Sequence, residues 1–72
     1  MQKTGVLFFD PQDDRFDIQY DGGGNYGGLH CGDCFEVFAD GAWQQTRMEY
    51  SDDWYLVGIK TECLNGLQVR LP

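Results

Sequence analysis

The stretch Cys34–Tyr50, CFEVFADGAWQQTRMEY, decides the fold of this 72-residue chain. Asp40-Gly41 supplies the pair of left-handed residues that a type I′ turn needs, and residues typical of strands flank it on both sides. A two-residue turn fixes the register, so Ala39 should face Ala42. The pairs that follow are Phe38 with Trp43, Val37 with Gln44, Glu36 with Gln45 and Phe35 with Thr46. The stretch is therefore predicted to form a β-hairpin.

The two faces of this hairpin should differ, because side chains alternate along a strand. One face is predicted to join the core, and it carries Phe35, Val37, Ala39, Ala42, Met48 and Tyr50. On the other face Phe38 lies beside Trp43, and Glu36 lies diagonal to Arg47. This second face is amphipathic and presents an aromatic pair.

Two strands are predicted before the hairpin. Gly5–Phe9 is a short apolar run, and the turn-forming residues that follow it end that strand. Arg15–Tyr20 alternates, which predicts a half-buried strand. Its inward residues are Phe16, Ile18 and Tyr20, and its outward residues are Arg15, Asp17 and Gln19.

Two more strands are predicted after the hairpin. Trp54–Ile59 is almost continuously apolar, which is typical of a strand in the centre of a sheet. A short helical turn over Thr61–Asn65 should lead to a last strand, Leu67–Leu71. We expect Leu67, Val69 and Leu71 to point inward.

The glycine-rich segment Asp21–Gly28 is predicted to be a mobile loop, because glycine loses more backbone entropy on ordering than other residues. Five or six short strands joined by tight turns indicate a sheet that bends back on itself. The prediction is one all-β domain spanning residues 1–72: a small, SH3-like, strongly bent antiparallel barrel of five or six strands with one Gly-rich loop.

The charge of the chain is formally −7, from twelve acidic and five basic residues. The basic residues are scattered, so direct binding to nucleic acid is not expected, and the acidic surplus repels anionic lipid. No apolar run has the length of a membrane helix, and no secretion signal is apparent, which predicts a cytoplasmic protein. The surplus indicates either solubility or a basic partner surface. We expect a monomer or weak homodimer without a cofactor.

The three cysteines, with His30, could in principle bind zinc through Cys31, Cys34 and Cys63. A lone C-x2-C pair is a weak signal, and the preferred interpretation is that Cys34 and Cys63 are small buried residues while Cys31 lies in a turn. Redox catalysis would require a helix at the C-x2-C pair, and none is predicted. A dinucleotide site at the glycine-rich segment fails for the same reason, because no helix follows it.

Several motifs together resemble a family of short bacterial proteins of unknown function: Gly28-Leu29-His30-Cys31-Gly32-Asp33, Phe35-Glu36-Val37, Trp43 before Arg47-Met48-Glu49, and Asp53-Trp54-Tyr55-Leu56-Val57-Gly58. Members occur mainly in Firmicutes, often on conjugative transposons or phages. The resemblance covers about the last two thirds of the chain. It implies a bacterial, cytosolic, mobile-element context and no particular activity.

The preferred function is a non-catalytic module that binds a protein partner. Exposed aromatic and arginine side chains dominate protein-binding hot spots. The candidate binding residues are Phe38, Trp43, Tyr26 and Arg47. Two alternatives stay open: an acidic protein that imitates nucleic acid and inhibits a host nuclease or defence complex, and a small zinc-binding fold.

Overall fold

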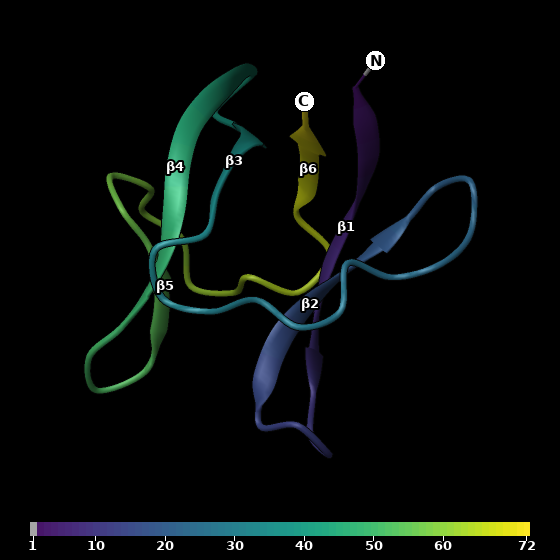
Figure 1. Cartoon of the computed structure of the whole chain (residues 1–72). Coiled ribbons are helices and arrows are strands. Elements are labelled where there is room, and N and C mark those ends of the chain that lie inside the picture. Colours follow the sequence, from purple (N-terminus) through teal and green to yellow (C-terminus); the bar gives the residue numbers. More distant parts are fainter. Residues whose placement is uncertain (1) are drawn as a thin grey trace.

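Six antiparallel strands build the whole fold in the computed structural model, which describes residues 2–72 (Figure 1). They are β1 (Lys3–Asp10), β2 (Arg15–Tyr20), β3 (Cys34–Ala39), β4 (Ala42–Tyr50), β5 (Trp54–Leu56) and β6 (Gln68–Leu71). Their order in the sheet is β2-β1-β6-β3-β4-β5. The predicted all-β class with five or six antiparallel strands is confirmed, and the number is six. Within residues 2–72 there is no helix that could cross a membrane.

The central hairpin forms in the predicted register. Ala39 pairs with Ala42 and Phe38 with Trp43, and the remaining pairs continue as predicted to Phe35 with Thr46. The backbone angle φ is 53° at Asp40 and 78° at Gly41. Both values lie in the left-handed region that a type I′ turn requires.

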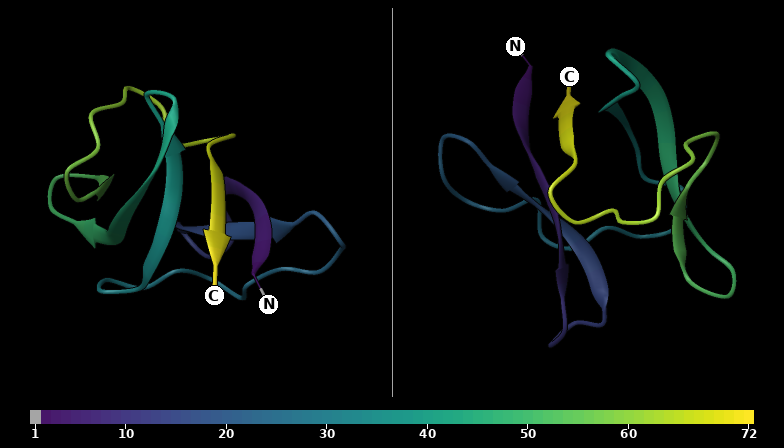
Figure 2. Two further views of the ribbon diagram at one scale, coloured as in Figure 1. Left: turned by 90° about the horizontal axis from the view of Figure 1, so that it is seen from above. Right: turned by 180° about the vertical axis from the view of Figure 1, so that it is seen from behind.

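The sheet is joined in its middle by the last strand of the chain. β6 lies between β1 and β3, with Gly5 opposite Val69 and Val37 opposite the same valine. It thus connects the β1–β2 hairpin to the β3–β4 hairpin, and the sheet bends strongly across this junction (Figure 2). No strand pairing among residues 2–72 joins β2 to β5, so hydrogen bonds do not close the sheet into a barrel.

The core fills the concave side of the bent sheet. Nine buried apolar residues form one cluster, contributed by all six strands and by the segment before β3. They are Leu7, Phe16, Ile18, Leu29, Phe35, Val37, Met48, Leu56 and Val69. Leu67 and Leu71 pack against this cluster from its margin, while Val69 is fully buried, so the predicted inward face of the last strand is correct.

The segment after β4 differs from the prediction. Only Trp54–Leu56 is a strand, and it lies at the edge of the sheet, paired with β4 alone. The predicted strand ends early because Gly58 adopts a left-handed φ of 78° and Ile59 N–H donates to the Leu56 carbonyl, which turns the chain. The helical turn predicted for residues 61–65 is absent. That segment is irregular and enters a turn at Asn65-Gly66.

The prediction for β2 was wrong at Asp17, which is buried instead of facing solvent. Its carboxylate oxygen Oδ1 accepts hydrogen bonds from the backbone N–H groups of Ile18, Gly27 and Gly28, at 2.7, 2.9 and 3.0 Å. The glycine-rich segment, predicted to be mobile, is therefore fastened to β2. Its second half follows the free edge of that strand, where Tyr26 N–H donates to the Ile18 carbonyl.

Four more side chains are exposed although they were predicted to be buried: Ala42, next to the hairpin turn, and Tyr50, Cys34 and Cys63. The ladder between β3 and β4 ends at Cys34 and Arg47, so at Tyr50 the strand β4 is paired with β5 alone. Tyr50 packs edge-on against Trp54 instead, with ring centroids 4.9 Å apart. Cys34 is the first residue of β3, and Cys63 lies in the irregular segment before β6. Both positions are exposed to solvent.

Candidate functional site

The aromatic pair predicted from the hairpin lies on the face of the sheet that turns away from the core. Phe38 and Trp43 are direct cross-strand partners, in alternation with the buried Val37. Their rings meet edge to face, 5.4 Å between centroids at an angle of 70°. Phe38 is 40% exposed, and Trp43 is half-buried. The pair is therefore open to solvent and held by its own packing.

Arg70, from β6, completes this surface. Its guanidinium lies 4.3 Å from the centre of the Trp43 ring, a cation–π contact. Two charge-assisted hydrogen bonds hold the same guanidinium, from Nε to Glu36 Oε1 at 3.0 Å and from Nη2 to Glu36 Oε2 at 3.2 Å. We call Phe38, Trp43 and Arg70 the outer patch. The sequence prediction missed Arg70.

Glu36 does lie diagonal to Arg47 across the hairpin, as predicted, but the two do not form an ion pair. β6 places Arg70 directly opposite Glu36, and Arg70 pairs with it instead. Arg47 instead pairs with Glu49 at 2.9 Å on its own strand. Only knowledge that the last strand pairs with β3 would have revealed this, and no local pattern contains that information.

A small hollow of about 150 Å³ adjoins Trp43. It is lined by Thr4, Gly5, Asp21, Trp43, Gln68 and Val69. The Thr4 hydroxyl donates to the Asp21 carboxylate at 2.6 Å, which fixes one wall. The outer patch thus has a shallow polar depression beside its aromatic ring.

Tyr26 does not join the outer patch. It lies on the segment that follows the free edge of β2, whereas Phe38 and Trp43 lie on the β3–β4 hairpin, beyond β1 and β6. Its side chain is 38% exposed. Desolvation by partial burial, followed by the nearby Asp33 carboxylate, raises the pKa of Tyr26 above its usual 10.0.

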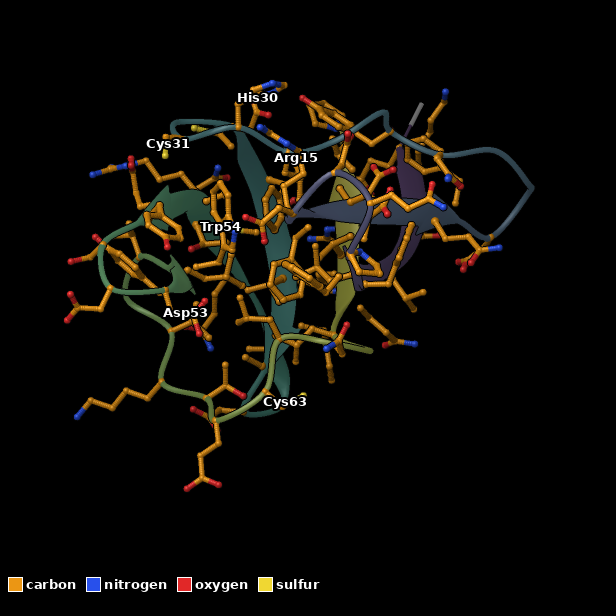
Figure 3. All side chains as sticks on the ribbon, turned by 90° about the horizontal axis from the view of Figure 1, so that it is seen from below. Arg15, His30, Cys31, Asp53, Trp54 and Cys63 are labelled. Carbon is orange, nitrogen blue, oxygen red and sulfur yellow. The ribbon has the colours of Figure 1, made fainter. Side chains whose placement is uncertain are left out.

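The candidate zinc ligands are not assembled. Cys31, Cys34 and Cys63 are exposed free thiols, and Figure 3 shows Cys63 far from Cys31 and His30. The His30 backbone N–H donates to the Asp33 carboxylate at 2.8 Å, which closes a turn around Cys31 and needs no metal. Among residues 2–72, no three His, Cys, Asp or Glu side chains are placed to hold a metal ion.

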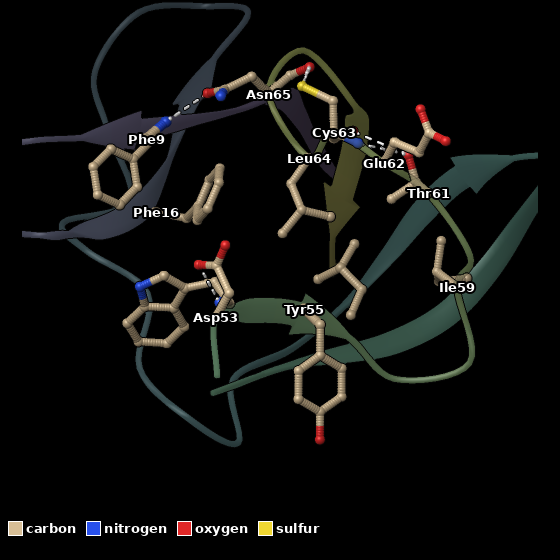
Figure 4. A pocket seen from close by; sticks show the side chains of 12 residues that line it. Phe9, Phe16, Asp53, Tyr55, Ile59, Thr61, Glu62, Cys63, Leu64 and Asn65 are labelled. Atoms are coloured by element: carbon tan, nitrogen blue, oxygen red, sulfur yellow. Dashed lines mark hydrogen bonds between the residues drawn. The ribbon is translucent and has the colours of Figure 1, made fainter. Parts of the chain in front are cut away.

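A second surface was not predicted from the sequence, because the aromatic residues of this surface lie in predicted strands and gave no separate signal. Between the β1–β2 hairpin and β5, where the sheet is not closed, lies a groove of about 520 Å³ (Figure 4). We call it the seam groove. Its apolar lining is Phe9, Phe16, Trp54, Tyr55, Leu56, Ile59 and Leu64; its polar lining is Asp53, Thr61, Glu62, Cys63 and Asn65. Phe9 and Phe16 pack edge to face with centroids 5.3 Å apart.

These features define a small all-β domain with one preformed aromatic–arginine surface and one apolar groove. The chain belongs to a family described as a domain of unknown function, DUF5348, whose model matches residues 5–71. A similar solved structure is the crystal structure of a protein from Ruminococcus gnavus, determined by a structural-genomics consortium. It is 48% identical and superposes with a TM-score of 0.87 over 94% of this chain and 99% of that one. No curated protein matches the chain.

Proposed function

We propose that this domain is a non-catalytic protein-interaction module of a bacterial mobile element, acting in the cytoplasm, and that the outer patch contacts its partner. The observation that carries the proposal is the arrangement of Phe38, Trp43 and Arg70 on the face away from the core. Similarity to the Ruminococcus gnavus protein supports a bacterial origin. The mobile-element setting rests on the resemblance described above.

Preorganisation is the physical reason for choosing this surface. Binding normally costs entropy, because interface side chains must be ordered when the complex forms. Here Glu36 already holds Arg70 through both oxygens, and Arg70 already lies on Trp43. A partner that covers Phe38 would thus gain apolar burial at a small ordering cost.

The other two candidate residues, Arg47 and Tyr26, lie away from the centre of the proposed contact. Arg47 is four residues along β4 from Trp43, a separation of about 13 Å at the usual strand rise, so we place it at the rim. Its pairing with Glu49 leaves it available only in part. Tyr26, across β1 and β6, is proposed to lie outside the contact.

The proposal is tested by capture from a bacterial lysate with the tagged domain. We expect Phe38→Ala to lose the captured protein while the fold is retained, because Phe38 is 40% exposed. Tyr50→Ala is the control: it removes a more exposed aromatic that lies about 23 Å along β4 from Trp43. Equal capture by wild type and Phe38→Ala would contradict the proposal. Loss of folding in Trp43→Ala would show that Trp43 is structural, without affecting the Phe38 test.

A second candidate is an acidic inhibitor that imitates nucleic acid. Seven acidic side chains are exposed, against three basic ones, one of which is already ion-paired. Salt discriminates between the two functions, since attraction between exposed charges is screened within about 8 Å at physiological ionic strength. Elution of a basic, nucleic-acid-handling protein at moderate salt would favour mimicry. Retention at high salt would favour the outer patch.

A further inference from the structure

We propose a second binding site: the seam groove takes an extended peptide segment that bears Lys or Arg next to alternating apolar residues and adds as a strand to the free edge of β5. The groove does not include the outer patch, so this proposal stands or falls separately from the proposed function. Three observations support it: the free backbone edge of β5, the apolar wall opposite, and the charge of the rim.

The backbone of β5 leaves one edge unpaired. Hydrogen bonds from Val57 N–H to the Arg47 carbonyl and from Ser51 N–H to the Asp53 carbonyl fix which residues of this strand face β4. Alternation along an antiparallel pair then places the backbone groups of Trp54 and Leu56 on the opposite edge.

Two of the four groups on that edge are already satisfied. Trp54 N–H donates to the side-chain carboxylate of the preceding residue, Asp53, at 2.7 Å. The Leu56 carbonyl accepts from Ile59 N–H. Within residues 2–72 the Trp54 carbonyl and the Leu56 N–H have no partner outside the strands. One acceptor and one donor, two residues apart, are what an added strand would pair with.

The wall opposite this edge is apolar. Phe9 and Phe16 face the groove from the β1–β2 hairpin, and Leu64 closes it from above β5 (Figure 4). A volume of about 520 Å³ lies within the range of sites that enclose ligands. Side chains of an added strand that point the same way as Trp54 and Leu56 would enter this space.

The acidic side chains at the rim of the seam groove favour a positively charged peptide. Asp53 and Glu62 are exposed and line the groove, and the lining contains no Lys or Arg. A basic peptide therefore finds complementary charge there. A second copy of this chain is disfavoured as the occupant, because each copy carries −7 and the same acidic rim.

The cysteines provide a direct test. Cys63 lines the groove, whereas the equally free Cys31 and Cys34 do not. The probe is the end-blocked peptide Lys-Val-Thr-Val-Lys, and the readout is the rate of maleimide modification of each thiol, followed by mass spectrometry. At a peptide concentration four times its Kd, we expect the Cys63 rate to fall about fivefold, with the other two thiols unchanged.

Two controls test the mode of binding. Methylation of both valine backbone nitrogens should abolish protection, whereas methylation of the threonine nitrogen, which faces away from β5, should preserve it. Asp53→Asn with Glu62→Gln should weaken binding by roughly three- to tenfold at low salt, as expected for two exposed charge pairs, while Asp52→Asn should change little. Asn keeps an oxygen for Trp54 N–H.

The following results would contradict the proposed peptide site. Unprotected Cys63, or equal slowing of all three thiols, would overturn the site. Protection by the valine-methylated peptide would overturn strand addition. Phe38→Ala should leave Cys63 protection intact, so failure of the outer patch and failure of the seam groove can be told apart.

Discussion

At the scale of single residues, Gly5 shows how tightly this small core is built. It lies in β1 between β2 and β6, opposite both Tyr20 and Val69. A Cβ at this position would collide with the Gln19 carbonyl oxygen and would lie 2.9 Å from Ile18 Cγ2. Backbone and a fully buried side chain cannot easily move aside, so only glycine fits.

Gly5→Ala is accordingly expected to lower the free energy of unfolding by about 1–3 kcal/mol, the usual cost of overpacking. Urea denaturation measures it. Gly22→Ala is the matched control, because a Cβ there meets nothing within 4 Å and no left-handed angle is required. A Gly5→Ala protein as stable as wild type would show that β1 and β2 do not approach this closely.

Tyr26 gives a pH-dependent prediction. Burial and the Asp33 carboxylate raise its pKa above 10.0, so the folded state prefers the protonated phenol. The resulting stabilisation is fully present below pH 10, the unfolded pKa, and is lost as the pH rises through the folded pKa.

The difference in ultraviolet absorbance between wild type and Tyr26→Phe, followed through an alkaline titration, should reveal a phenol that ionises above pH 10. Asp33→Asn should lower that pKa part of the way and leave the burial contribution. Ionisation of Tyr26 at or below pH 10 would contradict the described environment.

At the scale of elements, Asp17 joins the glycine-rich segment to β2. One carboxylate oxygen serves three backbone N–H groups, and the segment then covers the strand edge that would otherwise be open. Unpaired strand edges invite aggregation. The segment is thus a cover for the end of the sheet.

Asp17→Ala should cost about 2–3 kcal/mol of stability, because buried donors lose their acceptor. Asp17→Asn, which keeps one oxygen, should cost less. Amide hydrogen exchange should quicken at Gly27 and Gly28 in the alanine variant before it quickens in β6. Unchanged exchange at these two glycines would show that the carboxylate does not fasten the segment.

The elements also show what sequence could and could not predict. The β3–β4 register followed from Asp40-Gly41 because a two-residue turn specifies every later pair locally. The position of β6 between β1 and β3 did not follow, because pairing between strands that are distant in the sequence leaves no local pattern. The edge position of β5 did not follow either, because it depends on which other strands the rest of the sheet leaves unpaired. Arg70 and the seam groove depend on these positions, so the geometry of the outer patch was only half predicted: the Phe38–Trp43 pair followed from the register, and the contact with Arg70 did not.

At the scale of the whole molecule, a single bent sheet offers two different surfaces. Its convex middle carries the outer patch, and its unclosed seam carries the groove. The charge of −7 favours a partner with basic character at either surface. Both ideas require the domain to act through contacts rather than through bond-breaking chemistry.

Calorimetric titration of the captured partner with wild type and with Phe38→Ala tests the central claim most directly. Loss of a central aromatic anchor typically costs 2 kcal/mol or more, so we predict a Kd raised about 30-fold or more, with Tyr50→Ala within about twofold of wild type. An unchanged Kd for a correctly folded Phe38→Ala protein would contradict the claim that the outer patch binds the partner.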